Sequence, residues 1–334
     1  MLNETRHIDL HLPKGWNFCT TEELEQIAGI LATHTLQADR YHPFSWLSVK
    51  VEMLFAINHL SVLPAPPSDS ATYLVRFTST SRTWWGRLFG KFRHNPDNEP
   101  FEMSTEMVHA LITERLSWVD DDKADPLLRV PYPTLKLRKS SRFSFRALTL
   151  QGPTPLLDGY TWMQYRHLQD YMQEYVKYTN MLSQLSRFNR EQLQQYMDLG
   201  RQAEEARNAF LAILFRPEDD AKGDNTSSPL SPTLFAGFDP IKWQVILFWW
   251  SGLMRYLQQK YPHCYKADKP SKRTRRSNPL ELYVRTTATI EKYIGLNEEE
   301  VNRQSFHVIL QHLEDMAKES EETERLNRKY KSKK

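Results

Sequence analysis

Apolar residues recur at helical spacing along most of the chain, and polar cap residues precede several of these stretches. Thr20 and Glu23 have the spacing of a capping box, in which two side chains bond backbone N–H groups of a first helical turn. Apolar residues then follow from Leu24 to Leu31. The same reasoning predicts further helices, at about residues 45–60, 104–118, 161–176, 190–215, 239–260, 278–295 and 297–318.

Strand signals are fewer. His7–Leu12 alternates between apolar and polar residues and predicts a short edge strand that stops at Pro13. Tyr73–Thr78 predicts a second strand, and the extended segments Thr134–Arg138 and Phe143–Leu150 predict a hairpin. The predicted fold class is therefore mainly α: a multi-helix bundle with a minor β element (α+β) in the N-terminal half.

The pattern divides the chain into two regions. Residues 1–152 form a predicted N-terminal α+β region, in which residues 68–100 differ in composition and are interpreted as an insertion. Residues 153–334 form a predicted helical region with a basic linker at 266–277. Its last part, 318–334, is almost wholly charged and predicts a solvated, fraying tail.

Composition narrows the class of protein. The chain has 334 residues, of which 40% are hydrophobic and 25% charged, and this balance is typical of a globular protein. Its 11 glycines argue against phosphate-cradling loops. Its 9 Trp, 15 Tyr and 16 Phe predict either a well-filled core or a large contact surface.

The cysteines and the N-terminus bear on the compartment. Cys19 and Cys264 lie far apart and belong to no disulfide or metal-binding motif, so we do not expect a disulfide framework. The expected compartment is therefore a reducing one. The first residues contain no apolar signal-peptide segment. Ile241–Met254 is interrupted by polar residues and is shorter than the roughly 20 residues of a membrane span, so we expect a buried core helix and a cytoplasmic protein.

Two acidic patterns suggest metal chemistry, but neither meets its requirements. Glu106 and His109 have the i, i+3 spacing of a di-iron ligand pair, yet a second such pair on another helix is missing. Asp120–Asp122 with Asp125 could bind Mg²⁺, but consecutive loop aspartates point apart, which favours a solvated acidic loop. We predict neither a metal site nor a cofactor.

Signatures of common enzyme classes are missing from the sequence. The chain has no GxSxG, Walker A, HExxH or GxGxxG motif. Cys264 follows His263 directly, but adjacent residues do not face each other, and nothing nearby in the sequence would lower a thiol pKa. We therefore predict a protein that is not an enzyme; the alternative is an enzyme whose site is assembled from scattered residues.

Two segments are candidates for binding. The first, from Trp84 to Arg93, mixes aromatic and basic residues. We rank three roles for it in decreasing order: packing against the body of the protein, docking of a partner protein, and contact with a membrane surface. Together with the helix after Thr161 it supplies the predicted partner-binding residues, which are Trp84, Trp85, Phe89, Trp162 and Tyr165. The second is the basic run within 266–277, which is either a solvated linker or a nucleic-acid contact. In the latter case the contact residues are Lys272, Arg273, Arg275 and Arg276.

Three motifs occur in an ordered series: Leu12-Pro13-x-x-Trp16, then Asp158-x-x-Thr161-x-x-Gln164-Tyr165-x-x-Leu168, then Ala212-x-Leu214-x-Arg216-Pro217. Over residues 7–260 this order resembles the tail assembly chaperone-like proteins of phage and prophage tail-assembly modules. The resemblance implies a non-enzymatic protein that coats or guides another polypeptide, such as a tape-measure protein. The insertion at 68–100 and the charged C-terminus depart from a compact chaperone.

Overall fold

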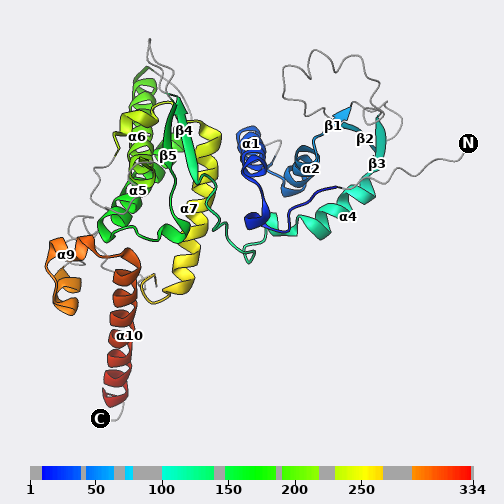
Figure 1. Cartoon of the computed structure of the whole chain (residues 1–334). Coiled ribbons are helices and arrows are strands. Elements are labelled where there is room, and N and C mark those ends of the chain that lie inside the picture. Colours follow the sequence, from blue (N-terminus) through cyan, green and yellow to red (C-terminus); the bar gives the residue numbers. More distant parts are fainter. Residues whose placement is uncertain are drawn as a thin grey trace, which may run out of the picture. The chain divides into compact units, whose positions relative to one another are not determined.

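Helices make up most of the computed structural model, which describes residues 10–38, 43–63, 72–77, 100–138, 147–185, 190–217, 230–265 and 288–331 (Figure 1). Two small three-stranded sheets accompany the helices. The predicted fold class, mainly α with a minor β element, is therefore confirmed.

The chain divides into two compact units. Unit 1 comprises Met1–Leu127 and Pro240–Trp249, and unit 2 comprises Leu128–Asp239 and Trp250–Lys334. The division after Leu127 lies earlier than residue 152, because the hairpin that follows pairs with a strand of unit 2.

The helices of unit 1 begin where the sequence predicts. They are α1 (Thr21–Gln37), α2 (Trp46–Ile57) and α4 (Thr105–Arg115). The Thr20 hydroxyl accepts a hydrogen bond from the Glu23 N–H at 3.2 Å, and the Glu23 carboxylate accepts one from the Thr20 N–H at 2.6 Å. The Ser45 and Ser104 hydroxyls cap α2 and α4 by each accepting one hydrogen bond, from the N–H groups of Ser48 and Met107. Local cap chemistry thus sets all three helix starts.

The sheet of unit 1 is antiparallel with the order β1-β2-β3. Its strands are β1 (Leu60–Leu63), β2 (Thr72–Phe77) and β3 (Phe101–Ser104). Strand β2 confirms the strand predicted at 73–78, although it lies within the predicted insertion; residues 78–99 fall outside the described part. Strand β1 replaces the predicted end of the second helix. Residues 7–9 of the predicted N-terminal strand are also not described, and Leu10–Leu12 is not a strand.

The first sequence motif has a packing role. Trp16, in the short helix η1 (Trp16–Phe18), meets Trp118 of η3 (Ser117–Val119) edge to face, with ring centroids 4.9 Å apart. The Trp118 indole N–H donates to the Pro13 carbonyl at 2.9 Å. The motif therefore joins the N-terminal segment to the end of α4.

Unit 2 contains the predicted hairpin, of which residues 143–146 lie outside the described part of the chain. Strands β4 (Thr134–Arg138) and β5 (Ala147–Gln151) pair antiparallel, and β6 (Arg216–Pro217) extends the sheet beside β5. The buried Tyr160 links this edge to α6, because its hydroxyl donates to the Leu214 carbonyl at 2.6 Å and its ring lies under the Arg216 guanidinium at 4.3 Å. The second and third motifs of the sequence meet here.

The helices of unit 2 are α5 (Trp162–Gln184), α6 (Arg190–Leu214), α9 (Glu298–Arg303) and α10 (Phe306–Lys331), with short turns η4 (Pro155–Leu157) and η6 (Pro232–Phe235). Capping boxes at Thr161 and Asn297 start α5 and α9. The helical residues 288–294 end at Gly295, whose φ of +75° is the left-handed cap that glycine favours.

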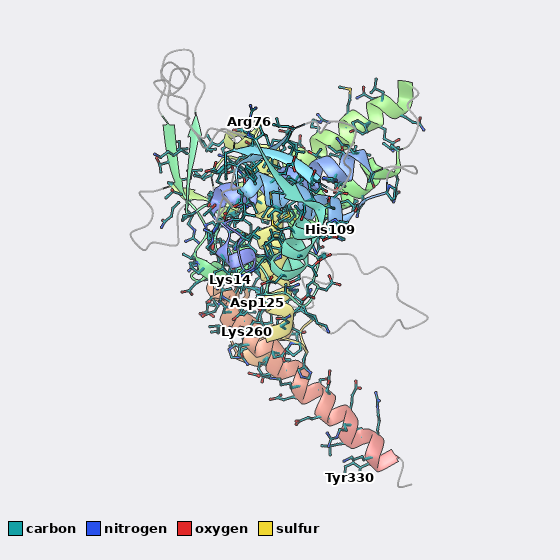
Figure 2. The ribbon with its side chains drawn as sticks, turned by 90° about the vertical axis from the view of Figure 1, so that its right-hand side faces the viewer. Lys14, Arg76, His109, Asp125, Lys260 and Tyr330 are labelled. Atoms are coloured by element: carbon teal, nitrogen blue, oxygen red, sulfur yellow. The ribbon has the colours of Figure 1, made fainter. Side chains whose placement is uncertain are left out.

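The last helical segment is divided into two helices. It breaks between Arg303 and Phe306, where Ser305 forms a β-bridge with Thr161, so α9 and α10 are separate helices. The charged tail is helical to Lys331, the last residue that the structure describes, and Tyr330 lies near the far end of this helix (Figure 2). Ion pairs four residues apart, such as Arg328 with Glu324, stabilise it locally.

Helix α7 (Pro240–Lys260) contributes residues to both units. Its tryptophans Trp243, Trp249 and Trp250 are buried, which confirms the predicted core helix. Across the described ranges, helices that combine the length and hydropathy needed to cross a membrane are absent.

Candidate functional site

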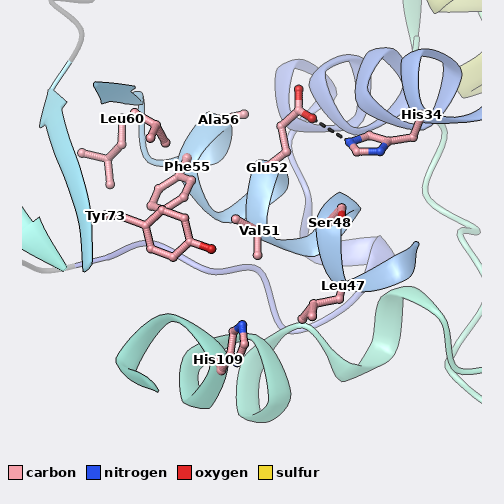
Figure 3. Close-up of a pocket in the computed structure, with 11 residues that line it drawn as sticks. His34, Leu47, Ser48, Val51, Glu52, Phe55, Ala56, Leu60, Tyr73 and His109 are labelled. Carbon is pink, nitrogen blue, oxygen red and sulfur yellow. Dashed lines mark hydrogen bonds and ion pairs between the residues drawn. The ribbon is translucent and has the colours of Figure 1, made fainter. Parts of the chain in front are cut away.

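An open groove of about 590 Å³ lies on unit 1 beside α2 (Figure 3). Side chains from α1, α2, β1, β2 and α4 contribute to it. The lining residues are His34, Leu47, Ser48, Val51, Glu52, Phe55, Ala56, Leu60, Val62, Tyr73 and His109.

The groove exists because α2 is apolar on two faces. One face, which includes Val49, Met53 and Leu54, is buried in the core of unit 1. Leu47, Val51 and Phe55 follow at intervals of four residues on another face and line the groove. Along this second stripe Leu47 is exposed and Val51 half-buried, whereas Phe55 is buried, so the stripe is accessible at its Leu47 end.

Aromatic and polar groups shape the walls. Tyr73 of β2 meets Phe55 edge to face, with ring centroids 5.4 Å apart. His34 of α1 and Glu52 of α2 are joined by a contact of 2.7 Å between Nε2 and Oε2. His109 of α4 lies on the opposite side, beneath α2 in the view of Figure 3. The lining is thus largely apolar with a few polar groups at its edges.

The groove holds a histidine–carboxylate pair but not an assembled nucleophile. Within the described residues, the His34–Glu52 pair has no hydrogen bond to the Ser48 or Tyr73 hydroxyl. Clusters of three or more potential metal ligands are also absent from the described ranges, and this includes the surroundings of Glu106 and His109. The arrangement is suited to binding apolar surface.

The acidic loop that suggested a cation site has other partners. The Asp120 carboxylate forms an ion pair with the nearly buried Lys50 at 2.6 Å. Asp121 accepts a hydrogen bond from the Lys123 N–H at 2.8 Å. Both carboxylates therefore stabilise the fold of unit 1.

Two of the predicted partner-binding residues lie in the core of unit 2. Trp162 and Tyr165 are only 4% and 1% exposed. The Tyr165 ring stacks on Phe306 at 4.5 Å, and its hydroxyl lies 2.6 Å from that of Tyr265. Burial, followed by the neighbouring Tyr265, raises the pKa of Tyr165, so the hydroxyl stays protonated. The helical stripe that was interpreted as a contact surface faces inward in this structure.

The remaining predicted binding residues cannot be located. Trp84, Trp85 and Phe89 lie outside the described residues. The same holds for Lys272, Arg273, Arg275 and Arg276. Their roles stay predictions.

Cys264 is unsuited to thiol chemistry. Burial raises its pKa to about 12, and the nearby carboxyl group of Glu314 adds to the shift. Its Sγ lies 3.4 Å from the Leu310 carbonyl, to which it donates. At neutral pH the group is therefore a thiol, which is a poor nucleophile.

None of the sequence motifs points to the groove residues. A signal was nonetheless available in α2, where apolar residues occupy more of the helix surface than one core contact needs. The contributions of Tyr73 and His109 depend on elements far apart in the sequence.

Comparison of the chain with models of known families, with curated proteins and with solved structures returns no match.

Proposed function

We propose that this protein is a non-enzymatic assembly factor that binds an apolar helical segment of a partner polypeptide in the α2 groove. The observation that carries the proposal is the second apolar stripe of α2, in which Leu47 stays 48% exposed at the groove edge. An amphipathic helix presents anchors at intervals of three and four residues, and the stripe Leu47, Val51 and Phe55 has the matching interval.

The shape of the groove favours a macromolecule over a small ligand. Small-molecule sites enclose most of the ligand surface. Here Leu47 and Val62 stay exposed at the rim, and apolar residues at an open rim favour a partner that continues beyond the groove.

The ordered motifs support a more specific role in phage or prophage tail assembly. A factor of this kind would cover the apolar segments of a tape-measure-like partner until assembly. We place this role in the cytoplasm, because Cys19 and Cys264 are both free thiols.

Replacing Leu47 by glutamate is expected to abolish partner recovery while the melting temperature changes little. A charge at the exposed rim costs little in the free protein, but it would be desolvated beneath a bound helix. The measurement is a nuclease-treated pull-down of the tagged chain from its host, followed by titration of the recovered protein against both variants.

Leu36→Glu is the matched control, because Leu36 is 87% exposed and lies outside the groove. It should retain the partner. Equal recovery with Leu47→Glu and Leu36→Glu would rule out the groove as the binding site.

Nucleic-acid binding is the second candidate function, and the run of basic residues at 272–276 favours it. If this run binds the phosphates of DNA, affinity falls with salt, and the slope of log K (the binding constant) against log salt concentration measures this effect. Replacing Arg273, Arg275 and Arg276 by alanine should then reduce the magnitude of that slope by roughly 2 to 3. Fluorescence anisotropy with a labelled DNA duplex at several salt concentrations measures this slope. An unchanged slope would assign the segment to a linker.

A further inference from the structure

The side chains that line the α2 groove carry a single formal charge, and it is negative (Figure 3). Glu52 is the only carboxylate among the described lining residues, which include no Lys or Arg. His34, Tyr73 and His109 complete the titratable groups and count as neutral in the formal charge at pH 7. A partner that brings positive charge to the groove therefore meets no like charge in its lining.

Glu52 carries its negative charge although it is paired with His34. The His34 Nε2 lies 2.7 Å from the Glu52 Oε2, and the Glu52 side chain is 52% exposed. A neutral imidazole donates such a hydrogen bond from its N–H, which orients the carboxylate without neutralising it. Glu52 thus presents an oriented acceptor to a cationic side chain at the edge of the groove.

A second carboxylate borders the groove on α4. Glu106 is exposed and stands three residues before His109, which lines the groove. Residues three apart are neighbours on a helix surface, so Glu106 flanks the groove about one turn from His109. Helix α4 passes beneath α2 in the view of Figure 3. The groove therefore has a carboxylate on its α2 side and another on its α4 side.

The basic residues of the elements that form the groove are directed elsewhere. Lys50 of α2 is nearly buried in its ion pair with Asp120. Arg115, the last residue of α4, pairs with the adjacent glutamate at 3.1 Å. Arg76 of β2 is three residues from Tyr73, so it lies on the opposite face of the strand. In the described residues of unit 1, Asp and Glu outnumber Lys and Arg, although the whole chain has a formal net charge of +3.

We propose that the helix bound in the α2 groove is basic, with Lys or Arg on both sides of its apolar stripe. This inference rests on the proposed binding of a helical segment and adds the chemistry of that segment. Leu47 and Phe55 lie about 12 Å apart along α2, or roughly two helical turns. An occupant helix of this length presents about three apolar anchors, and the positions beside them place basic side chains toward Glu52 and Glu106.

The test uses three labelled peptides of about 18 residues, which is above the length at which isolated helices are marginal. The peptides share one leucine stripe and differ in the flanking positions, which are Lys, Gln or Glu. Fluorescence anisotropy measures their affinity for the full chain. We expect the Lys peptide to bind at least about tenfold more tightly than the Glu peptide, which places like charges together. Raising the salt concentration from about 0.1 to 1 M should reduce this preference, because it shortens the Debye length from about 10 to 3 Å.

The net charge of the chain opposes the expected result, because +3 would favour the Glu peptide. Glu52→Gln combined with Glu106→Gln should weaken the Lys peptide roughly fivefold and leave the Gln peptide unchanged. Glu102→Gln combined with Glu114→Gln is the matched control, since both positions are exposed. Glu102 pairs in register with Leu74, which lies on the face of β2 away from the groove, and Glu114 lies on another face of α4. The control pair should bind the Lys peptide as the wild type does.

Equal affinity for the three peptides, or an equal loss in the control pair, would overturn the inference. If Leu47→Ala then weakens all three peptides, the groove binds helices without a preference for charge, and the proposed function stands. If no peptide binds, or if Leu47→Ala changes no affinity, the groove is not a helix site and the proposed function fails as well. Sedimentation velocity of the chain alone tests a different occupant: a dimer that Leu47→Ala dissociates would assign the groove to a second copy and reject the basic helix.

Discussion

Replacing Phe306 by alanine is expected to lower the free energy of unfolding by about 3–5 kcal/mol, the usual loss for a fully buried aromatic ring. The Phe306 side chain is completely buried at the start of α10 and stacks on Tyr165 of α5. Its backbone N–H also donates to the Tyr160 carbonyl at 3.2 Å. The substitution would therefore leave a cavity where α5 and α10 meet. Urea denaturation followed by circular dichroism measures the loss.

Val308→Ala is the control for this prediction. Val308 lies two residues further along α10 and is exposed, so its truncation should change the stability by no more than about 0.5 kcal/mol. If both variants unfolded at the same urea concentration as the wild type, the stacked pair would not be part of the core of unit 2.

Replacing Glu314 by alanine is expected to destabilise the protein by about 2–5 kcal/mol, because it leaves two inward-facing N–H groups without their acceptor. The Glu314 side chain is almost fully buried on α10. Its Oε2 accepts hydrogen bonds from the N–H groups of His263 and Cys264 at 2.9 and 3.0 Å, and Lys318 lies 3.6 Å from its Oε1. The carboxyl group thus fixes the segment that follows α7.

Glu314→Gln separates the hydrogen bonds from the charge. Its amide oxygen can still accept from the backbone, so a loss smaller than that of Glu314→Ala is expected. Glu322→Ala, at an exposed position of the same helix, should be nearly neutral. The same denaturation experiment compares all three variants. Equal stability of Glu314→Ala and Glu322→Ala would show that the two N–H groups find other partners.

Features that depend on neighbouring residues could be predicted from the sequence. The capping box at Thr20 forms as expected because it requires side chains only three residues apart, and the boxes at Thr161 and Asn297 have the same spacing. Strand β1 was missed because a short apolar run becomes a strand only through pairing, here with β2. The break before Phe306 likewise depends on the distant Thr161.

The candidate site could not be predicted from the sequence, for a related reason. A periodic stripe identifies one face of a helix, but it does not reveal whether the protein or a partner covers that face. Tyr165 was assigned to a partner and is packed against Phe306. Leu47 was not singled out and lies at the edge of the groove. The difference arises from which elements pack on α5 and on α2, and this is a property of the whole fold.

The far part of α10 is stabilised by different interactions from those that stabilise the other helices. Residues 322–330 are all exposed, so their helical form depends on local ion pairs and on continuity with the buried first turns. Such a segment melts residue by residue from its free end, without a cooperative transition. On heating, part of the helical signal therefore declines gradually before either core opens, and backbone amides there exchange with solvent by local opening.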